Sequence, residues 1–281
     1  MLKVLTQGQV DHYFREGFLH VKGVYSPESI DRIREIMANA LKDGTWESAP
    51  HHNEGVTTDV FRVMPELVDL FFTEKYVQVF KDLFGDEMVV LPEPAIHRNR
   101  FYFWHKDSSF LDEQGEKYHW NDDFNAIMAA MYFQDNDDVY GGGITVAGGT
   151  HKDKEDLHHK VAHMNTFQRA FLKIQKILGI SFYDKLEKHP KLVRVPSKKG
   201  DLVLLDIRID HKGSTPKGTR ENYDKFAYFN IVTDNHKYTK DLNRCLRARP
   251  SGYYSNYLKH DKELPASLIQ KGKELDFNLD F

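Results

Sequence analysis

Short segments rich in β-forming residues fill much of the chain from residue 86 onward, and this pattern constrains the fold more than any other feature. Aliphatic and aromatic residues concentrate in these segments, and turn-forming or charged residues separate them. Seven segments show the pattern: 88–91, 96–104, 124–133, 143–147, 192–195, 202–207 and 226–232. Consecutive short strands of this kind predict a β-sandwich or a β-barrel.

Two amphipathic helices are expected before these strands. A Ser-Pro-Glu cap followed by apolar residues at helical spacing predicts a helix over 27–42. A second helix should begin around Pro65 and end before Gly85, which suits a left-handed stop. We expect these helices, within about residues 1–85, to pack on the β-core.

A charged, helix-like segment at about 153–189 interrupts the run of strands. It resembles an insertion on a β-scaffold and is a candidate lid, together with the loop 108–123. No internal repeat or long Pro/Gly/Ser linker divides the chain. We therefore expect a single domain over residues 1–281.

Composition narrows the classes of partner and the compartment. With 281 residues and 40% hydrophobic content, the chain can build a sizeable core. Its net charge of −3 argues against nucleic acid or an anionic membrane as the main partner, which favours a small molecule. A single cysteine, Cys245, cannot form an internal disulfide, and MLKVLTQGQV lacks the apolar core of a signal peptide. We expect a cytoplasmic protein with no membrane-spanning segment.

The stretch FWHKDSS carries the first candidate metal ligands, His105 and Asp107. If the preceding strand continues through it, the two side chains leave the same face, two residues apart. An imidazole and a carboxylate are two of the three ligands that a divalent metal needs from such a site. A His-x-Asp pair is common by chance, and the alternative is a pair of hydrogen-bonded residues at a strand end.

A second buried strand runs into His211, and a Gly/Pro turn then leads to Arg220. His211 could be the third ligand, and the planar guanidinium of Arg220 suits a carboxylate. The alternative for Arg220 is a surface ion pair with Glu221 or Asp224. Two imidazoles and one carboxylate occupy one face of an iron(II) ion and leave open positions for a chelating cosubstrate and oxygen.

At this point the sequence resembles the phytanoyl-CoA dioxygenase-like (PhyH) family of iron(II)/2-oxoglutarate-dependent oxygenases. The similar segments are spread along the chain in the family's order: FREGFLHVKGVYSPESIDRIREIM, WHKD, GGGITVAGGTHK and GDLVLLDIRIDHKGS. The resemblance implies a mainly β fold with flanking helices and a double-stranded β-helix (jelly-roll, cupin-like) core. It also implies that His105, Asp107 and His211 bind iron(II), and that Arg220 anchors the distal carboxylate of 2-oxoglutarate.

Two further cosubstrate contacts follow from the resemblance, although the sequence departs from the family pattern. A hydroxyl often lies two residues after the distal histidine; here that position is Gly213, and Ser214 is the substitute. Asn99 matches a polar residue that touches the cosubstrate in some relatives. Of the aromatic residues before the metal motif, Phe103 and Trp104 are candidates for the substrate pocket, and core packing is their alternative.

The implied activity is that of a dioxygenase that consumes O2 and 2-oxoglutarate, releases succinate and CO2, and hydroxylates an unactivated C–H bond of a small polar molecule. Asp107 is retained where halogenating relatives carry a small residue, which favours hydroxylation or desaturation. A jelly-roll isomerase that uses another metal, or a non-catalytic small-molecule binding protein, is the alternative. A hydrolase with metal-bound water would leave Arg220 without a role.

Overall fold

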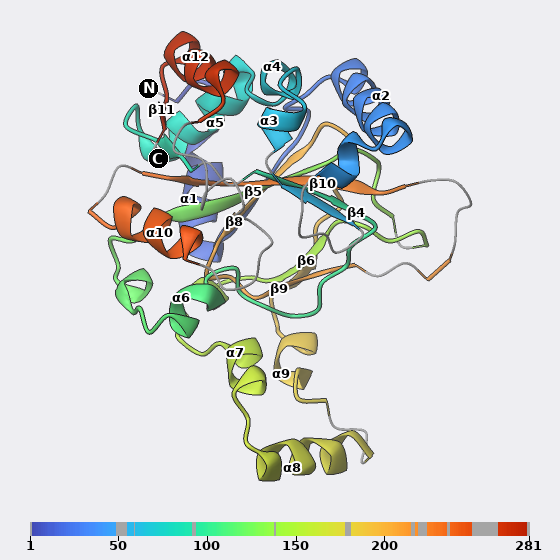
Figure 1. Cartoon of the computed structure of the whole chain (residues 1–281). Coiled ribbons are helices and arrows are strands. Elements are labelled where there is room, and N and C mark those ends of the chain that lie inside the picture. The colour runs from blue at the N-terminus through green and yellow to red at the C-terminus, as the bar shows by residue number, and fades with distance from the viewer. Residues whose placement is uncertain are drawn as a thin grey trace.

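The computed structural model describes residues 2–48, 55–58, 60–91, 94–137, 139–177, 181–214, 217–218, 224–234, 237–248 and 264–279. Two sheets make up the core (Figure 1). The larger has the order β1-β8-β5-β10-β3-β11, with β4 also paired to β10 and β2 paired to β4, and the smaller has the order β7-β6-β9. The strands are β1 (Phe18–Val21), β2 (Val56–Thr58), β3 (Val89–Val90), β4 (Ala95–Arg98), β5 (Ala126–Tyr132), β6 (Ile144–Ala147), β7 (Leu192–Arg194), β8 (Leu202–Asp206), β9 (His211–Gly213), β10 (Phe226–Thr233) and β11 (Asn278–Leu279).

The central strand β5 shows why this segment forms the middle of the larger sheet. Every residue from Ala126 to Tyr132 is buried, because both faces of the strand are covered. Ile127 and Met131 belong to the apolar cluster on the helical side, whereas Met128 belongs to the cluster that contains Val146 of the smaller sheet. The core therefore consists of two layers, one on each side of the larger sheet.

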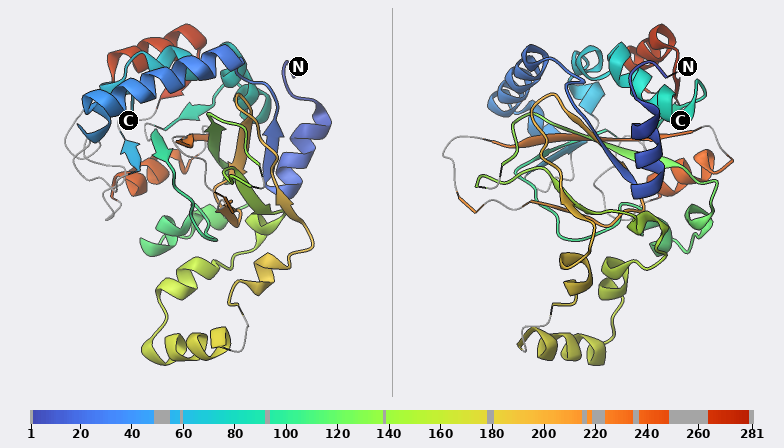
Figure 2. Two further views of the ribbon diagram at one scale, coloured as in Figure 1. Left: turned by 90° about the vertical axis from the view of Figure 1, so that its right-hand side faces the viewer. Right: turned by 180° about the vertical axis from the view of Figure 1, so that it is seen from behind.

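Helices cover the outer face of the larger sheet (Figure 2). The amphipathic helix expected over 27–42 is confirmed and directs its apolar stripe, including Ile30 and Ile33, into this layer. The helices and helical turns are α1 (Gln7–Glu16), α2 (Pro27–Asp43), η1 (Thr45–Ser48), α3 (Val60–Val63), α4 (Leu67–Phe71), α5 (Glu74–Phe84), α6 (Ser109–Glu113), η2 (Tyr118–Trp120), η3 (Thr150–Lys152), α7 (Leu157–Ala162), α8 (Thr166–Ile177), α9 (Asp184–Glu187), α10 (Thr239–Arg247) and α12 (Ala266–Leu275). None of the helices within the described ranges is long and apolar enough to cross a bilayer.

Two expected elements are wrong in extent. The helix expected from Pro65 to residue 84 is two helices, because Thr73 adopts an extended conformation and its side chain accepts the N–H of Tyr76 as a new N-terminal cap. The strand expected over 96–104 ends at Arg98, because the next residue, Asn99, has a positive φ of 53°. His105 therefore does not continue a long strand but forms an isolated bridge with His211.

The segment expected as an insertion leaves the barrel as a protruding arm, which we define as residues 157–187 (Figures 1 and 2). Helices α7 and α9 form its two legs, and α8 lies at its far end. The legs are attached by a small apolar cluster in which Leu157 and Leu186 pack with Trp104. The arm is therefore fixed to the barrel at its base.

One side chain joins the N-terminal segment to α5. The Asp82 carboxylate accepts the backbone N–H groups of Lys3, Val4 and Leu5 at 2.7–3.1 Å. Burial favours a higher pKa for Asp82, but the backbone N–H donors outweigh it and hold the pKa below its ordinary value. The ionised carboxylate is therefore the form that the fold stabilises.

We expect Asp82→Asn to lower the free energy of unfolding by about 1–3 kcal/mol, because an amide is a weaker acceptor for three N–H groups. Urea unfolding at pH 7 measures the change. Because the folded pKa is depressed, the wild-type advantage should be complete above the ordinary aspartate range and should shrink as the pH falls through the folded pKa. A loss that does not vary with pH would point to packing instead.

Candidate metal centre

Three side chains from two distant parts of the chain converge on one point. His105 Nε2 lies 3.6 Å from Asp107 Oδ1, and His211 Nε2 lies 3.7 Å from Asp107 Oδ2. One ligand atom from each residue can be chosen so that all lie within 4.8 Å of one another. The structure thus brings together the three residues that the sequence analysis proposed as iron ligands.

The two imidazoles have the tautomer that metal binding requires. His105 Nδ1 lies 2.6 Å from the carbonyl oxygen of Phe103, and His211 Nδ1 lies 3.1 Å from that of Ile209. Because a carbonyl oxygen can only accept, each Nδ1 carries the proton and each Nε2 presents a lone pair. Two such nitrogens and a carboxylate fit the two-histidine, one-carboxylate set that holds iron(II).

The surroundings set the charge of the site. Burial lowers the pKa of His211 to about 4, so this ring is neutral near pH 7. Burial also acts to lower the pKa of His105, but the neighbouring Asp107 carboxylate outweighs it and the pKa is raised. A proton on His105 therefore competes with a metal ion for the same nitrogen.

Backbone pairing aligns the two halves of the site. The N–H of His105 donates to the carbonyl of His211, and the N–H of His211 donates to the carbonyl of His105, both at 3.0 Å. This reciprocal pair sets the register of one ligand against the other. Convergence thus comes from this bridge and not from the continuous strand that the sequence suggested.

A buried lysine reinforces the alignment. Lys106, between the first two ligands, is 1% exposed, and its Nζ lies 2.8 Å from Oδ2 of Asp210, the residue before His211. The same Nζ donates to the carbonyl oxygens of Thr150 and Arg208 at 2.8 and 2.7 Å. The ammonium group of Lys106 therefore joins the segment that carries His105 and Asp107 to the segment that carries His211.

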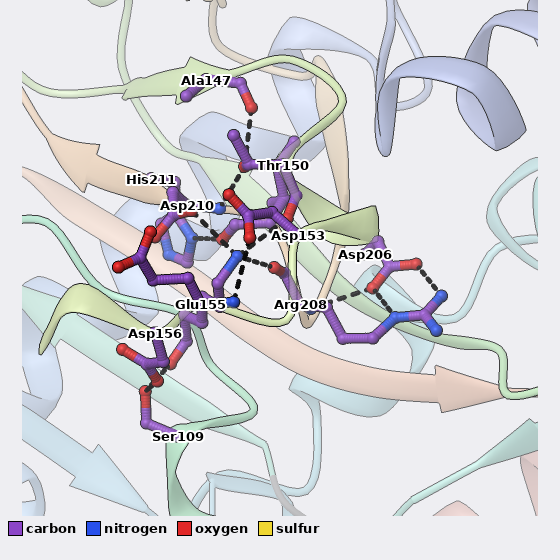
Figure 3. A network of polar contacts seen from close by, with 12 residues as sticks. Ser109, Ala147, Thr150, Asp153, Glu155, Asp156, Asp206, Arg208, Asp210 and His211 are labelled. Carbon is purple, nitrogen blue, oxygen red and sulfur yellow. Dashed lines mark hydrogen bonds and ion pairs between the residues drawn. The ribbon is translucent and has the colours of Figure 1, made fainter. Parts of the chain in front are cut away.

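The Gly-Gly-Thr-His turn at 148–151 also contributes to this network (Figure 3). Thr150 Oγ1 donates to the carbonyl of Ala147 and accepts the N–H of Asp210, at 2.8 and 2.9 Å. The turn therefore holds the end of β6 against the segment that enters β9. The threonine hydroxyl performs a structural function at this position.

A cavity of about 350 Å³ lies against the three ligands. Its wall combines aromatic and aliphatic side chains with polar and charged groups, as small-molecule sites do. The aromatic lining residues are Phe101, Tyr102, Phe103, Phe110, Tyr132, Phe226 and Phe229. The charged or polar ones outside the metal set include Arg100, Glu113, Gln134, His158 and Lys225.

The two aromatic residues proposed for the pocket have different positions. Phe103 lines the cavity and is 57% exposed, with its ring edge-on to Tyr183 of the arm. Trp104 is fully buried outside the cavity lining, and its indole N–H donates to Glu187 at 2.8 Å. Trp104 therefore has a packing position at the base of the arm.

The proposed cosubstrate contacts are placed as follows. Asn99 is exposed and is not among the residues that line the cavity; its amide donates to Asp224 and accepts the N–H of Lys225. Ser214 is buried beside Thr145, with 3.2 Å between their hydroxyl oxygens, and the lining residue is its neighbour Gly213. Arg220 lies outside the described residues.

Lys225 and His97 are two of the cavity-lining residues that were not predicted from the sequence. Lys225 precedes β10, and Phe226, Ala227 and Phe229 of that strand line the cavity as well. On β4, His97 is half-buried and packs against Phe229, and desolvation lowers its pKa to about 4. Both positions follow from the pairing of β4 with β10, which the sequence pattern alone does not define.

Comparisons with known proteins identify the family and the fold that the chain resembles. The family model described as phytanoyl-CoA dioxygenase (PhyH) matches residues 13–220. HygX from Streptomyces hygroscopicus, solved with nickel and 2-oxoglutarate, has a TM-score of 0.60 at 17% identity, covering 82% of this chain and 88% of its own. EctD from S. alaskensis with bound Fe has a TM-score of 0.57 at 14% identity, covering 82% and 77%. The carbocyclase SnoK has a TM-score of 0.57 at 16% identity, covering 82% and 84%.

These likenesses confirm the expected jelly-roll core with flanking helices. The search of curated proteins returned no match for the chain.

Proposed function

The chain belongs to the phytanoyl-CoA dioxygenase family and is a non-haem iron(II)- and 2-oxoglutarate-dependent oxygenase, and we propose that it hydroxylates an unactivated C–H bond of a small polar molecule. The convergence of His105, Asp107 and His211 at the cavity is the observation that carries the proposal. Bound iron(II) and 2-oxoglutarate supply the oxidising chemistry, in which O2 is consumed and succinate and CO2 leave.

The side chains of the site would bind the metal ion and position the substrate. His105, Asp107 and His211 would hold the metal, and their one-sided arrangement leaves room for ligands on the cavity side. The aromatic wall excludes water and positions the C–H bond to be oxidised. Retention of Asp107 supports hydroxylation over halogenation.

A cation near the start of β10 would bind the distal carboxylate of 2-oxoglutarate. Arg220 has this role in our proposal, with Ser214 as its hydroxyl partner. Lys225 is a second cation of this region and lines the cavity, with its Nζ 2.7 Å from the carbonyl oxygen of Gly141. A guanidinium can bind a carboxylate through two parallel hydrogen bonds, whereas an ammonium acts as a point charge.

We expect Arg220→Ala to raise the KM for 2-oxoglutarate roughly 10- to 100-fold, because a charge-assisted contact is lost. Initial rates of succinate release at varied 2-oxoglutarate measure it, with Lys225→Ala assayed in parallel. If only Lys225→Ala raises the KM, the anchor is Lys225 and the assignment of Arg220 is wrong.

The substrate class is inferred from the cavity. Arg100, Glu113 and Lys225 place charges of both signs among aromatic side chains, a composition that suits a polar molecule with an apolar part. Other proteins of this fold were solved with small molecules bound: HygX with hygromycin B and EctD with 5-hydroxyectoine. We also infer a cytoplasmic location, which agrees with the buried, unpaired thiol of Cys245.

The activity is tested by a succinate-release screen across polar substrate classes, with iron(II), 2-oxoglutarate and O2 present and Asp107→Ala as the blank. Succinate formed in step with a hydroxylated product supports the proposal. Product formation that needs no O2 would instead identify a metal-dependent isomerase, and ligand binding without any turnover would identify a binding protein.

A further inference from the structure

One face of α8, at the far end of the arm, exposes large apolar side chains. Phe167, Phe171, Ile174 and Ile177 are 82%, 55%, 53% and 84% exposed. Their spacing of three and four residues places them on a single stripe of the helix. Figures 1 and 2 show α8 standing clear of the barrel, which agrees with the exposure of these side chains.

The charge of the arm differs from that of the whole chain. From Leu157 to Tyr183 the sequence contains no aspartate or glutamate, but it contains Lys160, Arg169, Lys173 and Lys176. These four positive charges leave the rest of the chain at −7, because the total is −3. The net charge that argued against an anionic membrane therefore conceals a basic segment at one end of the molecule.

We propose that α8 docks the protein on the surface of an anionic lipid bilayer, with its apolar stripe in the boundary between headgroups and acyl chains. A stripe containing phenylalanine and isoleucine on a helix that also carries Arg169 and Lys173 has the composition of a helix that lies in a membrane interface. Such a helix needs no membrane-spanning length. The negatively charged remainder of the protein is repelled by the same surface, so the arm determines the contact.

Two other occupants of the stripe are less consistent with the structure. A second copy of α8 would bring together two helices that each contain three basic residues and no acidic residue, and their charges would repel. Closure of α8 over the protein's own cavity would require the legs to move. Leu157, Leu186 and Trp104 pack together at their base, and Tyr183 packs on Phe103.

Vesicle co-sedimentation tests the docking surface. The full-length protein is mixed at low salt with vesicles of phosphatidylcholine alone or with phosphatidylcholine and phosphatidylserine at 7:3. We expect binding to the phosphatidylserine vesicles at least tenfold tighter than to the neutral ones, weakening as salt is added.

Two variants separate the apolar and electrostatic contributions. Phe167→Ser/Phe171→Ser/Ile174→Ser should reduce binding to both vesicle types at least tenfold, because the inserted surface is lost. Arg169→Gln/Lys173→Gln should reduce the ratio of the affinities for phosphatidylserine-containing and neutral vesicles about tenfold or more. Phe14→Ser is the matched control, since Phe14 is 42% exposed on α1, outside the arm, and should leave binding unchanged.

Circular dichroism verifies that each variant is folded. Failure of the wild-type protein to bind phosphatidylserine vesicles at low salt would overturn the proposal, as would unchanged binding by the triple variant. A concentration-dependent dimer in light scattering, lost in the triple variant while vesicle binding persists, would assign the stripe to a second copy. A changed substrate KM in the triple variant, without vesicle binding by the wild type, would assign it to a lid.

Discussion

Asp107→Ala will abolish metal binding at the site and reduce 2-oxoglutarate turnover to the level of a control without enzyme. The carboxylate is the only anionic member of the set, and its two oxygens each face one imidazole at 3.6–3.7 Å. Without it, two neutral nitrogens remain, with no charge to offset that of a divalent cation. We expect the affinity for the metal ion to fall at least 100-fold. Anaerobic titration with iron(II), or electron paramagnetic resonance of added manganese(II), measures it.

The matched control for this prediction is Asp123→Ala. Asp123 is an exposed carboxylate that pairs with Lys237 at 3.0 Å, outside the lining of the cavity. This variant should retain metal affinity and turnover, since surface pairs contribute little. Metal binding by Asp107→Ala at wild-type affinity would show that the ion binds elsewhere.

Lys106→Met should lower the free energy of unfolding by about 3–5 kcal/mol, because it leaves the Asp210 carboxylate buried without its cation. Asp210 is 3% exposed, and burial already raises its pKa against the effect of Lys106. Denaturant unfolding without added metal measures this loss. Weaker iron(II) binding should accompany it, because the pair joins the segments that carry His105 and His211.

Two further variants test whether the loss of stability comes from the buried ion pair. Lys106→Met/Asp210→Leu should recover much of the stability, since an apolar pair of similar volume replaces the ion pair. Lys185→Met is the control: it removes an exposed partner of Glu155 and should cost less than about 1 kcal/mol. Equal losses in Lys106→Met and Lys185→Met would show that the buried pair has no special energetic role.

The sequence predicted the parts of the fold that depend on local pattern. The capped helix over 27–42 and the apolar strand at the centre of the larger sheet both formed as their local sequence patterns predicted. The helix from Pro65 failed because Thr73 is a better cap than an interior helical residue. The three-residue strand β9 is too short to leave a pattern in the sequence.

The metal ligands could be predicted from the sequence, but the residues that hold these ligands in position could not. Residue types and order placed His105, Asp107 and His211 together, with the help of a family resemblance. The ion pair between Lys106 and Asp210 is not visible in the sequence, because 104 positions separate two ordinary charged residues. Lys225 was missed because its importance comes from strand register, which only the pairing of β10 defines.

Both imidazoles are oriented in the same way, by the carbonyl oxygen of the residue two positions earlier in the chain. No side chain is needed to choose the tautomer, so substitutions around the cavity leave the tautomer of each ligand unchanged. Such a centre tolerates extensive remodelling of its walls, and new substrates can be accommodated during evolution without rebuilding the metal-binding apparatus.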